Sequence, residues 1–295
     1  MVITKVKIHA MVTIVSITRK KDKKEENLNL RHKTTHLLNL VYLMRLCILL
    51  GCATNSAELI SSIAESFPLL RVFTPRRKGN EEIILHDAHR SLLRQVSKET
   101  LISNLEEDNP TVVLSIGWPF LLKSDVLGGP WKCYNCHPSV LPRYRGVSIF
   151  YHMIVNHETT GGATFHEIDE GMDTGRVLLQ KTFQIDNFDT WLSLRDKSEE
   201  CRRSVILASL ALLHAEGNDV TLIPQDHAQA TVFARPRSPS DSEFDPARSV
   251  LDVYDHIRGC DEQRFPAYFY TPDGTKVCIK MWRAERPVDA PPNSL

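Results

Sequence analysis

The chain has 295 residues, and 42% of them are apolar, which is typical of a packed globular protein and excludes a fibrous or wholly disordered chain. Its 36 basic and 36 acidic side chains balance overall, but residues 1–43 hold nine basic against three acidic ones. The remaining chain therefore carries 27 against 33, a net charge of −6, which provides no global attraction to nucleic acid.

The first 43 residues differ in composition from the rest. No acidic residue occurs before a dense charge cluster over residues 19–26. Such a segment is typical of an organelle-targeting leader, of a disordered extension, or of residues upstream of a true start at Met44. We expect residues 1–43 to stand outside the fold, followed by a catalytic domain over residues 44–224 and a smaller unit over residues 225–295.

The seven cysteines are odd in number and scattered, which favours reduced thiols in a cytosol-like compartment. We therefore expect a cytoplasmic protein, or a mitochondrial one if the basic segment is a leader. The longest apolar run, residues 37–50, contains Asn39 and Arg45 and is too short to cross about 30 Å of hydrocarbon. No membrane segment is predicted.

From Met44 onward, short apolar runs alternate with amphipathic stretches, a pattern that predicts parallel strands joined by helices. Strands are predicted over residues 46–50, 70–73, 111–115 and 131–135. Helical spacing follows Asn55, with Glu58 at the position of a capping box, and recurs around residues 92–93 and 101–105. The order predicts a doubly wound, mostly parallel α/β sheet of Rossmann-like type, with a ligand crevice beyond the carboxyl ends of its strands.

The next stretch predicts two more strands, over residues 163–168 and 177–182, joined by a long structured loop. A helical stripe of apolar residues then runs from Leu194 to Leu212 and ends near Gly217, a residue suited to a helix C-cap.

A Pro- and Ser-rich linker over residues 235–241 begins the smaller unit. A helix is predicted over residues 250–257, and two strands over residues 267–270 and 277–282 flank a Pro-Asp-Gly turn. We expect a small β-rich, OB-like subdomain.

Asn135-Cys136-His137-Pro138-Ser139 stands at the predicted C-terminal end of a strand. Side chains alternate across a strand, so Asn135 and His137 are expected on one side and Cys136 on the other. Pro138 favours an extended backbone at His137, which continues the alternation. An amide and an imidazole are thereby predicted side by side at the mouth of the sheet.

These two side chains suit acyl transfer to an amine. Attack on a carbonyl carbon creates an oxyanion, and preorganised donors such as the Asn135 amide and a protonated His137 lower that barrier by about 3–4 kcal/mol each. The attacking nitrogen must lose a proton, which a carboxylate can take directly or through one water. The acidic loop over residues 169–175 offers such carboxylates, and one close to His137 favours the charged imidazole.

The pattern Asn135-x-His137-Pro-Ser-x-Leu-Pro142, followed by Asp173 within the acidic loop, resembles the signature of the 10-formyltetrahydrofolate-dependent formyltransferases. That family includes glycinamide ribonucleotide, methionyl-tRNA and nucleotide-sugar transformylases, and the resemblance extends over about residues 45–286. It implies that Asn135, His137 and Asp173 match the catalytic residues of the family. It also implies that 10-formyltetrahydrofolate is the formyl donor.

By the same resemblance, the pterin of the donor lies between the acidic loop and residues 117–122, whose aromatic and apolar side chains suit a flat heterocycle. The residues expected to contact the donor are Trp118, Phe120, Leu121, Leu122, Ile168, Asp169, Glu170 and Gly171.

The smaller unit bears on the acceptor amine. Its segment Arg237-Ser-Pro-Ser-Asp-Ser242 is similar to the C-terminal barrel of sugar N-formyltransferases such as the UDP-aminoarabinose enzyme, which favours a 4-amino sugar nucleotide. Methionyl-tRNA is the alternative, but residues 225–295 hold nine basic and eleven acidic side chains, which disfavours a tRNA clamp. Guanidinium forks bind phosphate and carboxylate bidentately. The predicted substrate contacts are Ser139, Arg143, Arg145 and Arg237. Whether the chain forms a homodimer is left open.

Other assignments compete for the same residues. Cys133-x-x-Cys136-His137 matches the pattern of covalent c-type haem attachment, which needs an export context and a small helical fold that this chain does not show. Zinc binding through these residues lacks a second pair of ligands, so no metal is predicted. A folate or nucleotide binder without turnover is disfavoured by the intact Asn135, His137 and Asp173. A hydrolase that releases formate to water is the chemically adjacent alternative.

Overall fold

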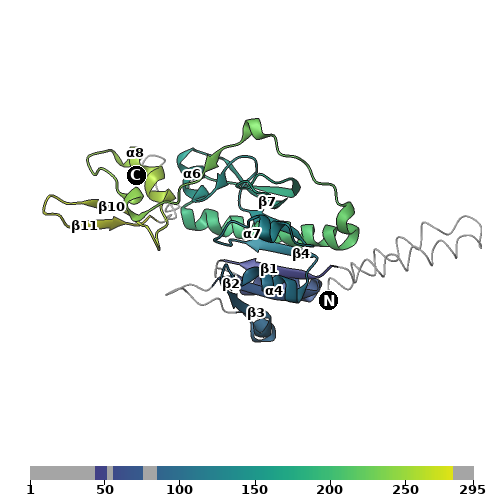
Figure 1. Cartoon of the computed structure of the whole chain (residues 1–295). Helices are drawn as coiled ribbons and strands as arrows, with labels where there is room; N and C mark the ends of the chain where they lie inside the picture. The colour runs from purple at the N-terminus through teal and green to yellow at the C-terminus, as the bar shows by residue number, and fades with distance from the viewer. Residues whose placement is uncertain (1–43, 52–55, 76–84, 282–295) are drawn as a thin grey trace, which may run out of the picture. The chain divides into compact units, whose positions relative to one another are not determined.

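Seven strands form the central sheet of the computed structural model, which describes residues 44–51, 56–75 and 85–281 (Figure 1). In sheet order the strands are β3 (Leu93–Val96), β2 (Leu69–Pro75), β1 (Leu46–Leu50), β4 (Val112–Ile116), β5 (Lys132–His137), β7 (Thr160–Glu167) and β8 (Val177–Gln184). Strands β1 to β5 are mutually parallel, β7 is antiparallel to β5, and β8 is antiparallel to β7. The predicted doubly wound, mostly parallel sheet is thereby confirmed. The predictions for residues 1–43 and for Asn55 lie outside the described residues.

Helices cover both faces of this sheet. On one face, α3 (Ser56–Ser66) and α7 (Trp191–Glu216) pack against apolar side chains of β1, β5 and β7. On the other face, α4 (Leu101–Asp108) and the short α5 (Ser124–Leu127) pack against β1, β4 and β5. The result is a three-layer α/β arrangement.

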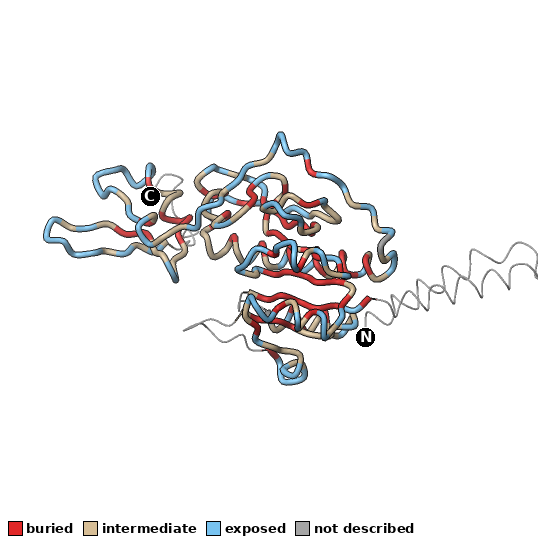
Figure 2. Tube along the Cα trace, in the orientation of Figure 1, coloured by how far each residue is buried: buried red, intermediate tan, exposed pale blue. Residues whose placement is uncertain are grey.

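Strand β1 shows why both faces need helices. All five of its side chains are fully buried, with Leu46, Ile48 and Leu50 in one core cluster and Cys47 and Leu49 in the other. Figure 2 shows the same burial along the central strands. A parallel strand covered on both faces reads as a continuous apolar run, which is the pattern seen in the sequence.

One predicted helix is wrong. The spacing around residues 92–93 predicted a helix, but the chain forms the 3-10 helix η1 (Asp87–Leu92), followed at once by strand β3. In β3, Leu93 pairs with Val72 of β2 at the edge of the sheet. Main-chain hydrogen bonds to β2 therefore favour a strand here over the helix that the local apolar spacing predicted.

Several elements were not predicted, among them helix α6 (Ile149–Val155). Two short strands, β6 (Arg145–Gly146) and β9 (Val232–Phe233), which pair in parallel, were not predicted either. A two-residue strand carries no readable periodicity, and α6 follows Ser148, which has a φ of 57° and forms no side-chain cap. The β6–β9 pair joins residues 232–233 to the segment that follows the Asn-x-His motif.

Helix α7 confirms the predicted helix and its C-terminal end, but of the predicted stripe only Leu194 and Val205 are buried, and the buried face continues instead through Ile206, Leu210 and Leu213. Its start is fixed by a capping box in which Thr190 accepts from the N–H of Ser193, and the Ser193 hydroxyl accepts from the N–H of Thr190. Its C-terminal end lies at Gly217, as predicted; the φ of 60° at this residue is one that glycine adopts without the strain that a Cβ atom would cause. The short 3-10 helix η2 (Gly217–Asp219) follows.

The C-terminal part holds α8 (Val250–Gly259) and an antiparallel pair of strands, β10 (Ala267–Tyr270) and β11 (Lys276–Ile279). Two 3-10 helices precede it, η3 (His227–Gln229) and η4 (Pro239–Ser242). The small β-rich subdomain predicted for this region is therefore present as a two-stranded antiparallel sheet with one helix. Its last strand ends at Ile279, and the boundary proposed between residues 224 and 225 stays a prediction.

Helix α8 packs against α6 (Figure 1). Val253 and Ile257 are buried in a cluster that Tyr151 of α6 completes. This contact brings the residues that follow α8 to the end of the sheet at which β4 and β5 finish. Across the residues that the structure describes, no helix combines the length and apolar character needed to cross a bilayer.

Candidate functional site

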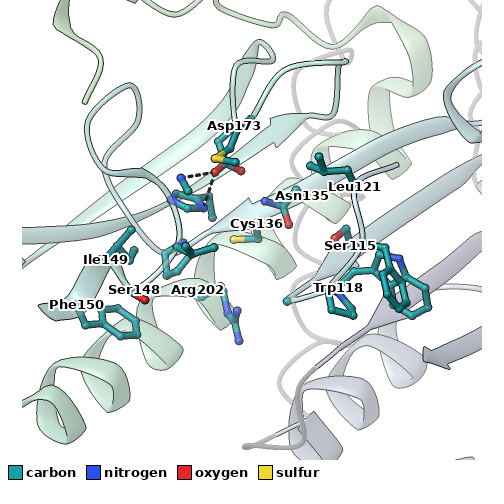
Figure 3. A pocket seen from close by; sticks show the side chains of 18 of the residues that line it. Ser115, Trp118, Leu121, Asn135, Cys136, Ser148, Ile149, Phe150, Asp173 and Arg202 are labelled. Carbon is teal, nitrogen blue, oxygen red and sulfur yellow. Dashed lines mark hydrogen bonds and ion pairs between the residues drawn. The ribbon is translucent and has the colours of Figure 1, made fainter. Parts of the chain in front are cut away.

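A cavity of about 680 Å³ opens at the carboxyl ends of β4 and β5, a volume within the usual range of small-molecule sites. Its wall combines residues that follow β4, the end of β5, the acidic loop after β7 and the start of α6 (Figure 3). Residues that follow α8 complete the wall. The crevice predicted beyond the carboxyl ends of the parallel strands is therefore present.

Strand β5 presents Asn135 and His137 to this cavity. The pairing of β5 with β7 continues to His137, which lies opposite Thr164, so the extended backbone reaches the histidine as predicted. Cys136, between the two, is 1% exposed and packs with Tyr134 in the core layer on the other side of the sheet, although it also reaches the wall of the cavity. The alternation along β5 therefore places Asn135 and His137 on one side of the sheet and Tyr134 and Cys136 on the other.

The His137 ring is held at both nitrogens. Nε2 lies 2.7 Å from the main-chain oxygen of Tyr144, which can only accept, so Nε2 carries a proton and donates it. Nδ1 lies 3.4 Å from Oδ2 of Asp173. Both ring nitrogens are thus engaged by protein oxygens, and a protonated His137 places its positive charge beside the cavity.

The acidic loop holds Asp173 in the left-handed region, with a φ of 53°. Its Oδ2 accepts from the N–H of Gly146 at 2.8 Å, and its Oδ1 lies 3.7 Å from Nε2 of His166. Dashed lines in Figure 3 mark contacts of Asp173. The amide, imidazole and carboxylate that the sequence singled out therefore line one cavity.

Gly175 lets this loop pack closely against the sheet. A Cβ atom at Gly175 would lie 1.9 Å from the main-chain oxygen of Glu167, so no larger residue fits without moving the backbone. The loop is thereby pressed onto the end of β7, from which His166 also points into the cavity.

His166 was not singled out from the sequence. Its Nδ1 lies 2.7 Å from the main-chain oxygen of Glu167, so the proton of the neutral ring sits on Nδ1. Burial lowers the pKa of this ring to about 4, and the Asp173 carboxylate offsets only part of that effect. The ring is therefore neutral at pH 7 and has a lone pair on Nε2.

That lone pair accepts from Nδ2 of Asn135 at 3.2 Å, which sets the orientation of the Asn135 amide. The signal that could have identified His166 is the strand register, in which it lies directly opposite Asn135. Register between strands 31 residues apart is a tertiary property, so the sequence alone did not reveal it.

Seven of the eight residues predicted to contact the donor line the cavity, and Glu170 does not. The seven are Trp118, Phe120, Leu121, Leu122, Ile168, Asp169 and Gly171. Phe120 and Leu121 are 39% and 66% exposed although they are apolar. Exposed apolar side chains beside a cavity form a surface on which a flat heterocycle can stack.

Three of the four predicted substrate contacts have structural partners instead and do not line the cavity. Ser139 is fully buried and donates to the main-chain oxygen of Arg143. The Arg143 guanidinium pairs with Glu158. Arg145 is 4% exposed and donates from both Nε and Nη2 to the side-chain oxygen of Gln225. That these residues contact substrate stays a prediction, which the lining of this cavity does not support.

Arg237, the fourth, lines the cavity. Its guanidinium lies 3.3 Å from the centre of the Tyr151 ring, and its Nη2 donates to the main-chain oxygen of Asp241 and to the Ser242 hydroxyl. Its Nη1 has no hydrogen-bond partner among the described residues. Arg237 is therefore rigidly held and keeps one donor group unused.

The far rim of the cavity was missed from the sequence. It includes Asp261, Arg264 and Phe265, which follow α8, together with Trp191 and Phe150. The N–H of Arg264 donates to Oδ1 of Asp261, which fixes the turn. These residues carry no motif, and only the packing of α8 on α6 brings them to the site.

The thiol alternatives have little support in the geometry. Burial raises the pKa of Cys133 to about 12 and also raises that of Cys136, so both thiols stay protonated. The two cysteines face opposite core layers. In the part of the chain that the structure describes, no cluster of three or more His, Cys, Asp or Glu side chains could hold a metal ion.

Comparisons with known proteins show the family of this chain. The family described as Formyl transferase matches residues 71–210. A methionyl-tRNA formyltransferase of Nitrosomonas eutropha is 30% identical over 251 residues, which cover 80% of this chain and 77% of that protein. One of Kosmotoga olearia is 32% identical over 174 residues, which cover 58% of this chain and 54% of that protein, so the chain spans about half the length of this relative.

Solved structures share the fold at low identity. A sugar N-formyltransferase from Shewanella sp. superposes with a TM-score of 0.67 and 20% identity, covering 83% of this chain and 100% of that one. WlaRD, a sugar 3N-formyl transferase whose structure was obtained in the presence of dTDP and 5-N-formyl-THF, gives a TM-score of 0.57 and 19% identity over 74% of this chain and 79% of that one.

Proposed function

Since this chain belongs to the formyltransferase family, we propose that it transfers the formyl group of 10-formyltetrahydrofolate to a primary amine, with a 4-amino sugar nucleotide as the acceptor. The observation that carries the proposal is the placement of Asn135, His137 and Asp173 in one cavity with an apolar wall on one side and cations on its far rim.

Asn135 is assigned to the formyl oxygen. One N–H of its amide is bound to His166, which leaves the second N–H for the oxyanion that forms when the amine attacks. A protonated His137 adds positive charge beside that oxygen while its own N–H groups face Tyr144 and Asp173. A direct bond from His137 to the oxyanion requires Nε2 to leave the Tyr144 oxygen as the substrate enters.

Asp173 is assigned to the proton of the amine. The amine nitrogen forms a bond to the formyl carbon and passes its proton to Oδ1, directly or through one water, because Oδ2 is occupied by the N–H of Gly146. The tetrahedral intermediate then breaks its bond to N10 of the folate, which leaves with a proton. His137 lies beside the same carboxylate and can relay that proton.

The donor is assigned to the apolar wall. Trp118, Phe120 and Leu121 offer a surface for the pterin, and Asp169 and Gly171 lie on the loop that faces it. The solved neighbour obtained with 5-N-formyl-THF supports a reduced folate in this fold.

The acceptor is assigned to the far rim. Arg237 and Arg264 supply positive charge, and Trp191 and Phe265 supply aromatic faces. Phosphate groups suit guanidinium donors, and a nucleotide base suits an aromatic face. The sugar N-formyltransferase neighbour also supports an amino sugar, and the net acidic body disfavours a polyanion such as tRNA more than it disfavours a small anion.

The test uses the purified chain with 10-formyltetrahydrofolate and follows the appearance of tetrahydrofolate. We expect turnover with nucleotide-linked 4-amino sugars and none with the matched sugars that carry a hydroxyl in place of the amine. Tetrahydrofolate formation that needs no amine would instead show the hydrolase, and absence of turnover with every amino sugar would contradict the assigned acceptor.

Methionyl-tRNA is the second candidate, and the sequence relatives favour it. The Nitrosomonas protein of that function is 30% identical over most of both chains. The same assay, with charged initiator tRNA as the acceptor, distinguishes the two.

A further inference from the structure

Arg145 is a buried cation without a carboxylate partner within ion-pair distance among the described residues. It is 4% exposed and lies in β6, directly before Gly146. Its guanidinium donates to the side-chain oxygen of Gln225 from Nη2 at 2.6 Å and from Nε at 3.2 Å. Nη2 also lies 3.2 Å from Nδ1 of His227. Burying a charge is costly unless hydrogen bonds satisfy it, and the amide oxygen of Gln225 is the partner that Nε and Nη2 share.

The other end of the Gln225 side chain reaches the acidic loop. Because Arg145 can only donate, the oxygen of the amide must face Arg145 and the NH2 group must face away. That NH2 group donates to the main-chain oxygens of Asp173 at 2.9 Å and Gly175 at 2.7 Å. Gln225 is 7% exposed, and every polar atom of its side chain has a partner.

Asp173 is therefore held from two ends by neighbouring residues of one strand. Gly146 donates its N–H to the carboxylate, and Arg145 acts through Gln225 on the main-chain oxygen. The left-handed φ of 53° at Asp173 is a conformation that a non-glycine residue keeps only where its surroundings impose it. The two hydrogen bonds from the Gln225 amide to the main-chain oxygens of Asp173 and Gly175 supply such a constraint.

We propose that Gln225 is a positioning residue for the reaction: it clamps the main chain at Asp173 and Gly175 so that the Asp173 carboxylate stays between His137 and the N–H of Gly146. The proposal rests on the role of Asp173 given under the proposed function. Gln225 touches neither the cavity nor a reacting atom, and it acts only through the loop.

Gln225→Glu separates the two roles of this side chain, which accepts hydrogen bonds from Arg145 and donates hydrogen bonds to the acidic loop. The carboxylate of the variant still accepts from Arg145 and satisfies the buried cation, so the fold is retained. It has no N–H to donate and repels the main-chain oxygens of Asp173 and Gly175. Gln229→Glu, at an exposed position four residues on, adds the same charge away from the loop and is the matched control; it loses only the hydrogen bond from Gln229 to Asp226.

The first measurement is amide hydrogen exchange at Gly146, whose N–H reports on the Asp173 carboxylate without any substrate. In Gln225→Glu we expect Gly146 to exchange at least about tenfold faster. The N–H groups of Arg145 and Val147 donate to Thr231 and Phe233, not to the loop, and should stay within about twofold of wild type. Unchanged exchange at Gly146 would overturn the proposal.

The second measurement is formyl transfer. We expect kcat to fall by about tenfold or more in Gln225→Glu while KM for the folate changes by less than about twofold, because the donor wall is untouched. Gln229→Glu should match wild type. If the exchange at Gly146 rises and kcat does not change, the catalytic part of the proposal is wrong.

If Gln225→Glu does not fold, a second variant, Gln225→Asn, tests the same proposal. Gln225→Asn keeps an amide for Arg145 but withdraws its NH2 group from the loop by one methylene, and the same two results are expected. If the wild-type chain formylates no acceptor at all, the proposed function fails, whereas the exchange at Gly146 still decides whether Gln225 holds Asp173.

Discussion

His166 and Asn135 form a pair in which a buried, neutral ring fixes the orientation of an amide. An asparagine amide can turn over at little cost in water, and its oxygen rather than its nitrogen would then face the formyl oxygen. That second orientation would place the amide oxygen against the lone pair on Nε2 of His166, and two acceptors repel each other. The oxyanion donor is therefore preorganised by a residue that has no chemical step of its own.

Loss of either polar group of β5 should remove most of the activity. We expect Asn135→Ala and His137→Ala each to lower kcat by at least about a hundredfold, because each removes charge stabilisation that acts in the transition state. Steady-state formyl transfer and circular dichroism measure activity and folding separately. Cys136→Ala is the control: the thiol is 1% exposed and packs in the opposite core layer, although the residue reaches the cavity wall, and the variant should keep most of its activity. Full activity in Asn135→Ala or His137→Ala would contradict the mechanism.

His166 should also make the fold sensitive to acid. Its pKa is about 4 in the folded chain against 6.5 for an ordinary histidine, so between these values the unfolded chain binds a proton that the folded chain does not. Stability is therefore unaffected by this group above pH 6.5 and falls as the pH drops towards 4, by roughly 3 kcal/mol. Urea titrations between pH 7 and 4 measure this loss.

His166→Gln removes the titrating ring but keeps an acceptor for Asn135, and His166→Leu removes both. We expect both variants to lose the acid sensitivity and only His166→Leu to lose about tenfold or more in kcat. Equal acid sensitivity in wild type and both variants would show that the ring is not buried in its neutral form.

At the scale of elements, the site depends on a loop that is held by close main-chain contacts. The acidic loop turns left-handed at Asp173 and then presses Gly175 against the main chain of Glu167. Strand β6 contributes the N–H of Gly146 to the same carboxylate. The catalytic geometry is thus set by the meeting of β7, β6 and the loop, and not by the loop alone.

Gly175→Ala should misplace this loop. The added Cβ would meet the Glu167 oxygen at 1.9 Å, and because that atom is backbone the loop must move. We expect the free energy of unfolding to fall by about 2 kcal/mol or more, with loss of most formyl transfer. Gly274→Ala is the control: its φ of 85° costs about 1 kcal/mol, but no atom lies within 4 Å and activity should persist. Thermal denaturation with a parallel activity assay compares the two.

At the scale of the whole molecule, charge distinguishes the two acceptor classes. The chain from Met44 onward has a net charge of −6, so it lacks the broad positive field that draws a tRNA to its binder. The cations of the rim are few and local, which suits one or two phosphate groups.

The salt dependence of acceptor binding should follow this difference. For a sugar nucleotide we expect KM to rise by no more than about tenfold between 50 and 200 mM salt, whereas a tRNA with six or more phosphate contacts would lose about a thousandfold. Measuring KM for the acceptor at four salt concentrations, with the donor saturating, gives the slope. A steep slope would favour methionyl-tRNA.

The sequence by itself predicted six of the seven strands of the sheet, the C-terminal end of α7 and the presence of Asn135 and His137 on one side of β5. These features follow from local rules: buried parallel strands are continuously apolar, a glycine ends a helix, and side chains alternate along a strand. The motif and the acidic loop also pointed to the residues that line the cavity.

Only the tertiary structure decided which polar residues face the cavity and which hold others in place. Arg145 was expected to bind substrate, yet it is buried against Gln225, and His166 went unnoticed although it lies beside Asn135. The contact between Asn135 and His166 joins residues 31 apart in the sequence, and that between Arg145 and Gln225 joins residues 80 apart. A side chain's partners are set by strand register and packing between distant segments, and no local pattern encodes them.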